Sequence, residues 1–250
     1  MKSLFSVFLI FFFFSCSYNG NKDQEKKPET KQSTEAPEEK GWEDAMSAVV
    51  NLESYDGKRI LESGQGFFVT ENIIATRLSM INQADKVMAS PVNSNNKYRL
   101  TQYVAIDRIN DIILLKADSM NRKPVKLFTG TVPDGVKTIY LSVTPGNNIK
   151  LFSGKFFNRT TVQGSKLYRI SNRIGKSTFG APVFISSKEA IGIVYSGMVN
   201  YEPQSLVIPS TYIVRLLETQ KSQPLSLESL RSVTNEKTAA VNRNIKGLVL

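Results

Sequence analysis

The residues best placed to do chemistry lie in a turn at positions 174–184, which reads IGKSTFGAPVF and runs directly into an apolar strand. Its small residues let one backbone segment approach another closely, and such a turn can present a side chain at a cleft. Phe179 stands at the centre of the turn and carries no reactive atom. The hydroxyl of the neighbouring Ser177 is a poor nucleophile until a base removes its proton. The chemistry of this turn therefore depends on whether the chain supplies a base.

The chain contains no histidine and a single cysteine. The missing histidine removes the usual general base at neutral pH, the usual proton shuttle and the commonest metal ligand. A lysine whose pKa is lowered by desolvation is a conceivable base, but the sequence singles out no lysine for that role. The single cysteine excludes an intrachain disulfide. We expect no metal and no cofactor.

The composition is that of an ordinary folded protein with an excess of positive charge. The chain has 250 residues, of which 41% are hydrophobic and 22% charged, and its formal net charge is +10. This length fits one or two domains, and all-β folds of this size often form one. The lysines are spread along the chain and no nucleic-acid-binding signature is present. The charge therefore indicates solubility near an anionic surface, and no nucleic-acid partner is expected.

The amino-terminal segment has the pattern of a secretion signal. A short basic start precedes an apolar run at 4–14, which is too short to span a bilayer but suits a signal core. Ser15 followed by Cys16 and a polar chain resembles a bacterial lipoprotein signal, although Phe14 replaces the small residue of the common motif. The resemblance implies a signal peptide at 1–15 and a lipid-modified Cys16. Plain secretion with an incidental cysteine is the alternative.

Lipid modification at Cys16 would place the protein in the bacterial cell envelope, and Ser17 favours outer-membrane over inner-membrane sorting by resemblance to other lipoproteins. The segment 16–42 is rich in Lys, Glu, Pro and Ser and cannot bury enough apolar surface to fold. It is predicted to be a disordered tether between the membrane and the domain.

The segment 43–219 is predicted to be a folded all-β domain. Short apolar or alternating runs recur between turn-forming residues, which is typical of a β-sandwich or a pair of β-barrels. A serine at position 210 can cap a short helix at 211–219. The segment 220–250 is predicted to be a polar tail. The expected strands are 45–52, 64–69, 73–76, 87–89, 98–100, 103–106, 112–115, 137–143, 150–157, 166–170, 182–185, 190–195 and 205–209.

The order of these segments resembles the protease domain of trypsin-like serine peptidases, closest to the HtrA/Deg type. The resemblance spans residues 45–217 and implies two six-stranded antiparallel β-barrels with a short carboxyl-terminal helix. No single motif is highly specific, but seven occur in the family's order. They are the glycine-rich strand at 64–69, the segment of the catalytic histidine at 74–81, that of the catalytic aspartate at 107–116, the turn region at 140–156, the nucleophile strand at 178–184, the substrate-pairing strand at 192–197 and the closing element at 207–210.

Carried over position by position, the resemblance implies a degenerate catalytic triad. Asp111 matches the aspartate, whereas Ser79 falls on the histidine and Phe179 on the nucleophile. A two-residue insertion in the loop would instead match Ser177 to the nucleophile. The triad assigns proton transfer to the histidine, and this chain has none.

Three functions follow from this pattern. The first is a pseudoprotease that binds a peptide or an envelope protein along the strand edge at Tyr195, Ser196 and Gly197. The second is a divergent serine endopeptidase that uses Ser177 without a histidine base. The third is a structural envelope lipoprotein with a closed cleft, in which Phe179 is a core residue. The tail is shorter than the PDZ module that usually follows this domain, so the resemblance does not predict an oligomeric state.

Overall fold

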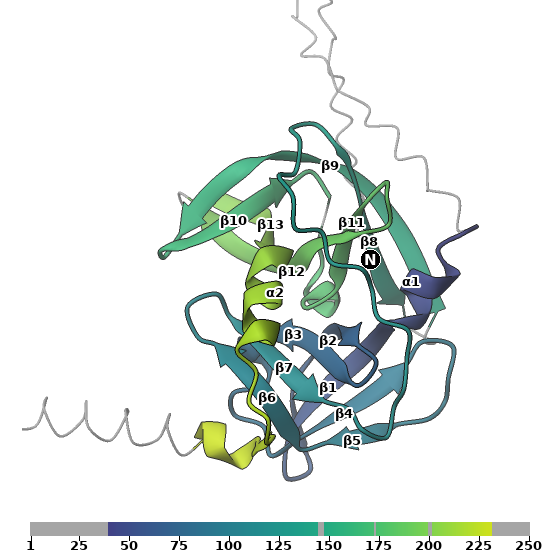
Figure 1. The fold of residues 1–250 in the computed structure, drawn as a ribbon, viewed down its shortest axis with the longest axis vertical. Coiled ribbons are helices and arrows are strands. Elements are labelled where there is room, and N and C mark those ends of the chain that lie inside the picture. The colour runs from purple at the N-terminus through teal and green to yellow at the C-terminus, as the bar shows by residue number, and fades with distance from the viewer. Residues whose placement is uncertain (1–39, 145–147, 173, 200–201, 232–250) are drawn as a thin grey trace, which may run out of the picture. The chain divides into compact units, whose positions relative to one another are not determined.

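The computed structural model describes residues 40–231 except 145–147, 173 and 200–201 (Figure 1). The predicted signal peptide, Cys16 and most of the predicted tether lie outside the described residues, and so do residues 145–147 of the predicted turn region at 140–156. Among the residues that the structure describes, no helix is long and apolar enough to cross a bilayer.

The first half of the domain is one curled antiparallel sheet of eight strands, in the order β14-β6-β7-β3-β2-β1-β4-β5. Inward and outward side chains alternate in β1 and β4, as expected of strands with one buried face. The elements are α1 (Glu43–Ser47), β1 (Val49–Asp56), β2 (Arg59–Thr70), β3 (Ile73–Arg77), the 3-10 turn η1 (Leu78–Met80), β4 (Lys86–Pro91), β5 (Tyr98–Leu100), β6 (Gln102–Asp107), β7 (Ile112–Lys116) and β14 (Leu225–Ser226).

The second half is a closed antiparallel barrel of six strands, in the order β10-β13-β12-β11-β8-β9. Its strands are β8 (Lys137–Thr144), β9 (Asn148–Val162), β10 (Ser165–Ile170), β11 (Pro182–Ile185), β12 (Ala190–Val199) and β13 (Glu202–Pro209). The 3-10 turn η2 (Lys176–Thr178) leads into β11, and α2 (Ser210–Glu218) follows β13. All four residues of β11 are buried, so the turn at 174–184 does run into an interior strand.

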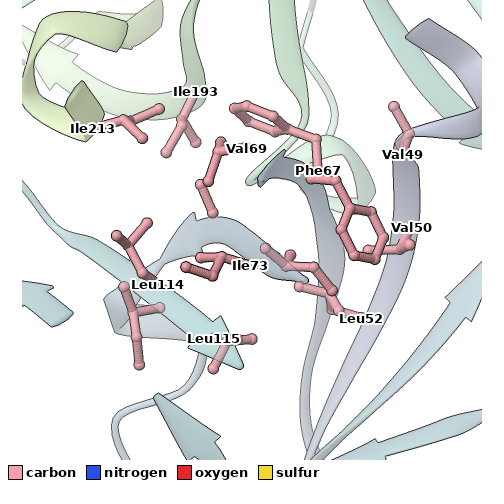
Figure 2. Close-up of a cluster of buried hydrophobic side chains, with 14 of the residues drawn as sticks. Val49, Val50, Leu52, Phe67, Val69, Ile73, Leu114, Leu115, Ile193 and Ile213 are labelled. Atoms are coloured by element: carbon pink, nitrogen blue, oxygen red, sulfur yellow. The ribbon is translucent and has the colours of Figure 1, made fainter. Parts of the chain in front are cut away.

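One apolar cluster joins the two halves. In Figure 2, Ile193 of β12 and Ile213 of α2 lie on one side of this cluster, and Val69 and Leu114 of the first sheet lie on the other. Phe67 is fully buried in the same cluster, and burying a side chain of this size contributes about 1.5–3 kcal/mol. The shared core fixes the first sheet against the barrel, and thereby fixes the loops that meet between them.

The all-β class and the short carboxyl-terminal helix are confirmed, and the two halves differ in closure. The first half is a curled sheet of eight strands that forms a half-barrel, where a six-stranded barrel was expected. Its two edge strands are also its shortest, with three residues in β5 and two in β14. Such short ladders offer too few hydrogen bonds to close a barrel.

Two local expectations were wrong at the domain's ends. Residues 45–47, predicted to begin a strand, belong to the helix α1, and β1 starts at Val49. The segment after Thr219, predicted to be a tail, continues the fold, because β14 pairs with β6 and the side chains of Leu227 and Leu230 are buried. The folded domain therefore extends past the predicted boundary at 219.

Candidate functional site

A single carboxylate organises the site between the two halves. Asp111, at the start of β7, accepts hydrogen bonds from the Ser79 backbone N–H at 2.6 Å and from Ser79 Oγ at 2.9 Å. Its backbone carbonyl oxygen accepts the Leu78 N–H at 3.1 Å. Asp111 holds a left-handed φ of 57°, a conformation that Asp tolerates better than most residues. This backbone turn directs the carboxylate at the 3-10 turn η1, where Ser79 lies.

An arginine completes the environment of that carboxylate. Arg77 Nε lies 2.8 Å from Asp111 Oδ2, and the two side chains are only 11% and 22% exposed. The guanidinium carbon lies 5.1 Å from the ring centroid of Phe179 and 4.6 Å from that of Tyr195. Each stack of a cation on an aromatic ring contributes about 0.5–2 kcal/mol, with the larger values where water is excluded. We call Arg77, Asp111, Phe179 and Tyr195 the arginine stack.

The loop that carries Phe179 is clamped to the glycine-rich strand β2. The backbone N–H of the fully buried Gln65 donates to the Phe179 carbonyl oxygen at 2.8 Å, and its side-chain amide donates to the Ser177 carbonyl oxygen at 3.1 Å. Gly180 has a φ of +89°, and a Cβ at this position would overlap the carbonyl oxygen of Gln65. The loop therefore approaches β2 as closely as its small residues allow. The two hydrogen bonds from Gln65 fix the position of the Phe179 backbone.

Ser177 lies on the exposed side of this loop. It lines a cavity of about 390 Å³, together with polar side chains from β1, β2 and the β4–β5 region that include Ser63, Ser90 and Asn95. In the part of the chain that the structure describes, no hydrogen bond joins Ser177 Oγ to a lysine, aspartate or glutamate. The cavity is a polar recess between the two halves of the domain, and Ser177 of the 177–180 loop forms part of its wall.

The strand edge predicted to bind peptide lies at the far end of β12. The last residue of β12 that is registered with β11 is Ile193, opposite Pro182, the first residue of β11. Val194 then exchanges hydrogen bonds with Gly180 and Ala181. On the other side, β12 stays paired with β13 as far as Val199. Tyr195, Ser196 and Gly197 therefore lie on a stretch of β12 that runs past the end of β11.

The structure brings most of the sequence-predicted residues together. Ser79 contacts Asp111 directly, and Phe179 and Tyr195 meet Asp111 through Arg77. Sequence reasoning missed Arg77 and Gln65. Arg77 did carry a signal, because a charged residue at the end of the apolar run 73–76 needs a partner if it is buried. Gln65 lies between two glycines of a buried strand and carried the same signal.

The positions that the resemblance assigns to the nucleophile and to the base carry side chains of a different kind. The side chain at 179 has no nucleophile, and the position expected for a base carries the hydroxyl of Ser79. The Asp111 carboxylate already accepts from Ser79 and Arg77. Among the described residues, no three His, Cys, Asp or Glu side chains gather in a way that could hold a metal ion.

Comparison with known proteins gives likeness at the level of fold. No protein-family model and no curated protein sequence matches the chain. Among solved structures, the active form of the Rv3671c protease from M. tuberculosis is similar with a TM-score of 0.63 at 15% identity, over 73% of this chain and 85% of that one. A serine endoprotease from Yersinia pestis is similar with a TM-score of 0.59 at 18% identity, over 71% of this chain and 64% of that one.

The MamO protease domain from Magnetospirillum magneticum is similar with a TM-score of 0.56 at 16% identity, over 70% of this chain and 97% of that one. The chain thus has the trypsin-like double-barrel fold of HtrA/Deg-type protease domains, which confirms the expected fold. At these identities the likeness establishes the fold alone.

Proposed function

We propose that this chain is a catalytically inactive domain of the trypsin-like fold, held in the bacterial envelope by a lipid on Cys16, and that it binds an extended segment of a peptide or protein. The observation that carries the proposal is the arginine stack. It fills the space beside the catalytic aspartate position with a side chain that has both a charge partner and two aromatic neighbours.

The case against catalysis is chemical. A serine hydroxyl needs a base to accept its proton and an acid to protonate the leaving amine, and both tasks fall to histidine in the triad. The sequence has no histidine, and loss of a triad member lowers the rate by about 10⁴-fold or more. Phe179 also places a ring where the nucleophile is expected. Cleavage of unfolded casein that disappears in Ser177→Ala would contradict this part of the proposal.

The case for binding rests on what remains of the cleft. An extended segment can add to the edge of a sheet through main-chain hydrogen bonds, with pockets for alternate side chains. The end of β12 at 195–199 supplies such an edge. The cavity beside Ser177 supplies a recess for a side chain. Phe179, which contacts the same arginine as Tyr195, connects these two features through the 177–179 loop.

Anchoring in the envelope rests on the sequence around Cys16, which lies outside the described residues. A lipid on Cys16, with Ser17 after it, favours the outer membrane. Fractionation of cells that express the full chain or Cys16→Ser tests this directly, because the variant is expected to leave the membrane fraction. Equal membrane association of both chains would contradict anchoring through Cys16.

Peptide binding is tested by screening the full chain against a library of extended peptides and measuring the affinity of the best hit. Replacing single amide hydrogens of that peptide by N-methyl groups is expected to weaken binding at least tenfold at alternate positions, because main-chain donors then lose their acceptors on β12. This change leaves the protein untouched. Affinity that is insensitive to every N-methyl group would contradict edge addition.

A matched pair of variants locates the site on the protein. Tyr195→Ala is expected to weaken binding of the same peptide at least fivefold, whereas Tyr98→Ala, which removes a half-buried tyrosine of β5, should change it less than twofold. Equal effects of the two variants would place the peptide elsewhere. A library without any binder would favour a purely structural role for the domain.

A further inference from the structure

A second recess is lined by residues of the β9–β10 hairpin and of α2, which are labelled in Figure 1. Its volume is about 370 Å³, within the range of about 300–1,000 Å³ that is typical of small-molecule sites. It shares no residue with the arginine stack or with the cavity beside Ser177. The side chains that define it are Arg159 of β9, Lys166 and Tyr168 of β10, and Thr211, Tyr212 and Arg215 of α2. We call this recess the basic pocket.

The charges of the basic pocket are all of one sign. Arg159, Lys166 and Arg215 are cationic, and no aspartate or glutamate is among the described residues that line it. Arg159 pairs with the carboxylate of Asp134, whose Oδ1 lies 3.7 Å from Arg159 Nη1, with the two side chains 45% and 76% exposed. An ion pair this long and this exposed is worth little. The three cations therefore retain most of their capacity to attract an anion.

The guanidinium of Arg159 is held in place by one hydrogen bond and two aromatic rings. Its Nη2 donates to the Val132 carbonyl oxygen at 2.7 Å. Its guanidinium carbon lies 5.2 Å from the Phe156 ring centroid and 5.9 Å from that of Tyr168. These contacts fix the plane of the guanidinium, so less side-chain freedom is lost when it binds. A fixed guanidinium suits the bidentate recognition of a phosphate, and Lys166 adds a point charge.

Neutral donors add to the charge. Tyr168 and Tyr212 bring phenol groups to the pocket wall, and Thr211 brings a hydroxyl. Burial raises the pKa of the Tyr168 phenol, so this group stays protonated and able to donate at neutral pH. The pocket also lies at the start of α2, whose first turn holds no acidic residue. The positive end of the helix dipole adds to the attraction of the three cations.

We propose that the basic pocket binds a phosphate group. The volume leaves room for the rest of the molecule that carries it, and the two tyrosine rings offer that remainder an apolar surface. An anionic phospholipid headgroup and a soluble phosphate compound present the same chemistry, and the experiment below separates them. This site is independent of the peptide-binding proposal, since it uses other elements and other residues.

The test uses the full chain and inorganic pyrophosphate as the probe, with binding measured by titration calorimetry at low ionic strength. One pyrophosphate is expected to bind per chain. The double variant Lys166→Gln/Arg215→Gln is expected to weaken that binding at least tenfold, because two charge-assisted contacts are lost. The matched control is Arg108→Gln/Lys137→Gln, which removes the same charge from exposed positions outside the pocket and should change the affinity less than threefold.

Vesicles of phosphatidylglycerol, compared with vesicles of phosphatidylcholine, form the second arm. The amino-terminal apolar run is expected to bind both kinds of vesicle, so its contribution cancels when binding to one lipid is subtracted from binding to the other. If the ligand is a headgroup, the pocket variant loses phosphatidylglycerol binding relative to the control pair, and pyrophosphate competes. If the ligand is soluble, pyrophosphate binding is weakened in the pocket variant, but the pocket variant and the control variant bind phosphatidylglycerol vesicles equally well.

Several results would overturn the proposal. If both double variants weaken pyrophosphate binding equally, the attraction comes from diffuse charge and no pocket exists for it. If the wild-type chain binds no pyrophosphate and its vesicle binding is the same in both pairs, the pocket has no phosphate ligand. All four substituted side chains are exposed, so melting curves should coincide. If the pocket pair lowers the melting temperature, Arg215→Gln alone takes its place against Arg108→Gln.

Discussion

Two arginines of this domain each lie near two aromatic rings, but only one of them is closely paired with a carboxylate. The guanidinium of Arg77 lies near the rings of Phe179 and Tyr195, and that of Arg159 near the rings of Phe156 and Tyr168. Arg77 meets a carboxylate at 2.8 Å and its side chain is 11% exposed. The Arg159 side chain is 45% exposed, and its carboxylate lies at 3.7 Å.

The difference shows how one motif can close a site or leave it available. The charge of Arg77 is matched within the protein by Asp111, so the arginine stabilises the cleft and offers little charge to an anionic ligand. The charge of Arg159 is only weakly matched, and Lys166 and Arg215 stand beside it. A single apolar cluster contacts both sites, since Phe179 and Tyr168 both pack against it. The predictions below separate the packed site from the open one.

The largest difference is expected between two glycines with similar backbone geometry. Gly180 has a φ of +89° and would place a Cβ against the carbonyl oxygen of Gln65, whereas Gly164, with a φ of +85°, has nothing within 4 Å. Gly180→Ala is expected to lower the free energy of unfolding by about 4 kcal/mol, from strain and overpacking together. Gly164→Ala carries only the conformational strain, about 1 kcal/mol. Chemical denaturation measures both.

Equal losses in the two alanine variants would contradict the packed loop. The clamp between Gln65 and the 177–180 loop would then contribute little beyond the backbone conformation. A loss at Gly164 larger than that at Gly180 would reverse the assignment of the packed and the open site.

The next largest effect is expected from removing each arginine in turn. Arg77→Met leaves a mostly buried Asp111 without its cation and is expected to lower the free energy of unfolding by about 3 kcal/mol. Arg159→Met removes an exposed pair and two weak ring contacts, with a loss of about 1 kcal/mol. Urea denaturation of the two variants and the wild type gives the comparison.

A double-mutant cycle locates the loss at Arg77. Arg77→Met/Asp111→Asn is expected to be less destabilised than the sum of the single variants, because neither change then leaves a charge alone. Additive losses would show that the ion pair is not the source of the stability. The cycle would then point to the stacking of Arg77 on Phe179 and Tyr195 alone.

The smallest effect concerns the cluster behind both sites. Burial raises the pKa of Tyr140 from its ordinary value of 10.0 to about 12. The folded state favours the neutral phenol. The free energy of unfolding is therefore unaffected by this group below pH 10 and falls as the pH rises from about 10 towards about 12. The loss at pH 11 is about 1.4 kcal/mol. Tyr140→Phe is expected to remove that part of the alkaline slope, measured by urea denaturation from pH 9 to pH 11.

An unchanged alkaline slope in Tyr140→Phe would contradict the burial of this phenol. The apolar cluster would then admit water, and Phe179 and Tyr168 would lack the dry support that both sites share. A slope that disappears in the variant would support a dry barrel behind the cleft and the basic pocket.

The fold was predictable where pattern and length agreed. The segments at 73–76, 98–100 and 182–185 are short apolar or alternating runs between turns, and the structure has β3, β5 and β11 there. The run at 45–52 fits either a helix or a strand by hydrophobicity. Its helical start was signalled by Glu43 and Asp44, acidic residues that suit a first turn. A two-residue strand such as β14 has too few residues to produce any pattern.

The site was predictable in part of its membership, whereas Arg77, Gln65 and the contacts between the members were not predicted. Ser79, Asp111 and Phe179 follow from the order of the motifs. Their connection through Arg77 depends on packing between segments far apart in the chain, which no local pattern encodes. A buried arginine predicts that some carboxylate lies nearby, but only the structure identifies Asp111. The basic pocket likewise needs the β9–β10 hairpin and α2 to be placed side by side.

We propose that the site between the two halves carries no activated nucleophile, and a fluorophosphonate probe tests this most directly. The full chain, shown to be folded by its melting curve, is incubated with the probe beside an active trypsin-like peptidase and analysed by peptide mass spectrometry. We predict labelling of the active peptidase and none of Ser177. Labelling of Ser177 that disappears in Ser177→Ala would contradict the account.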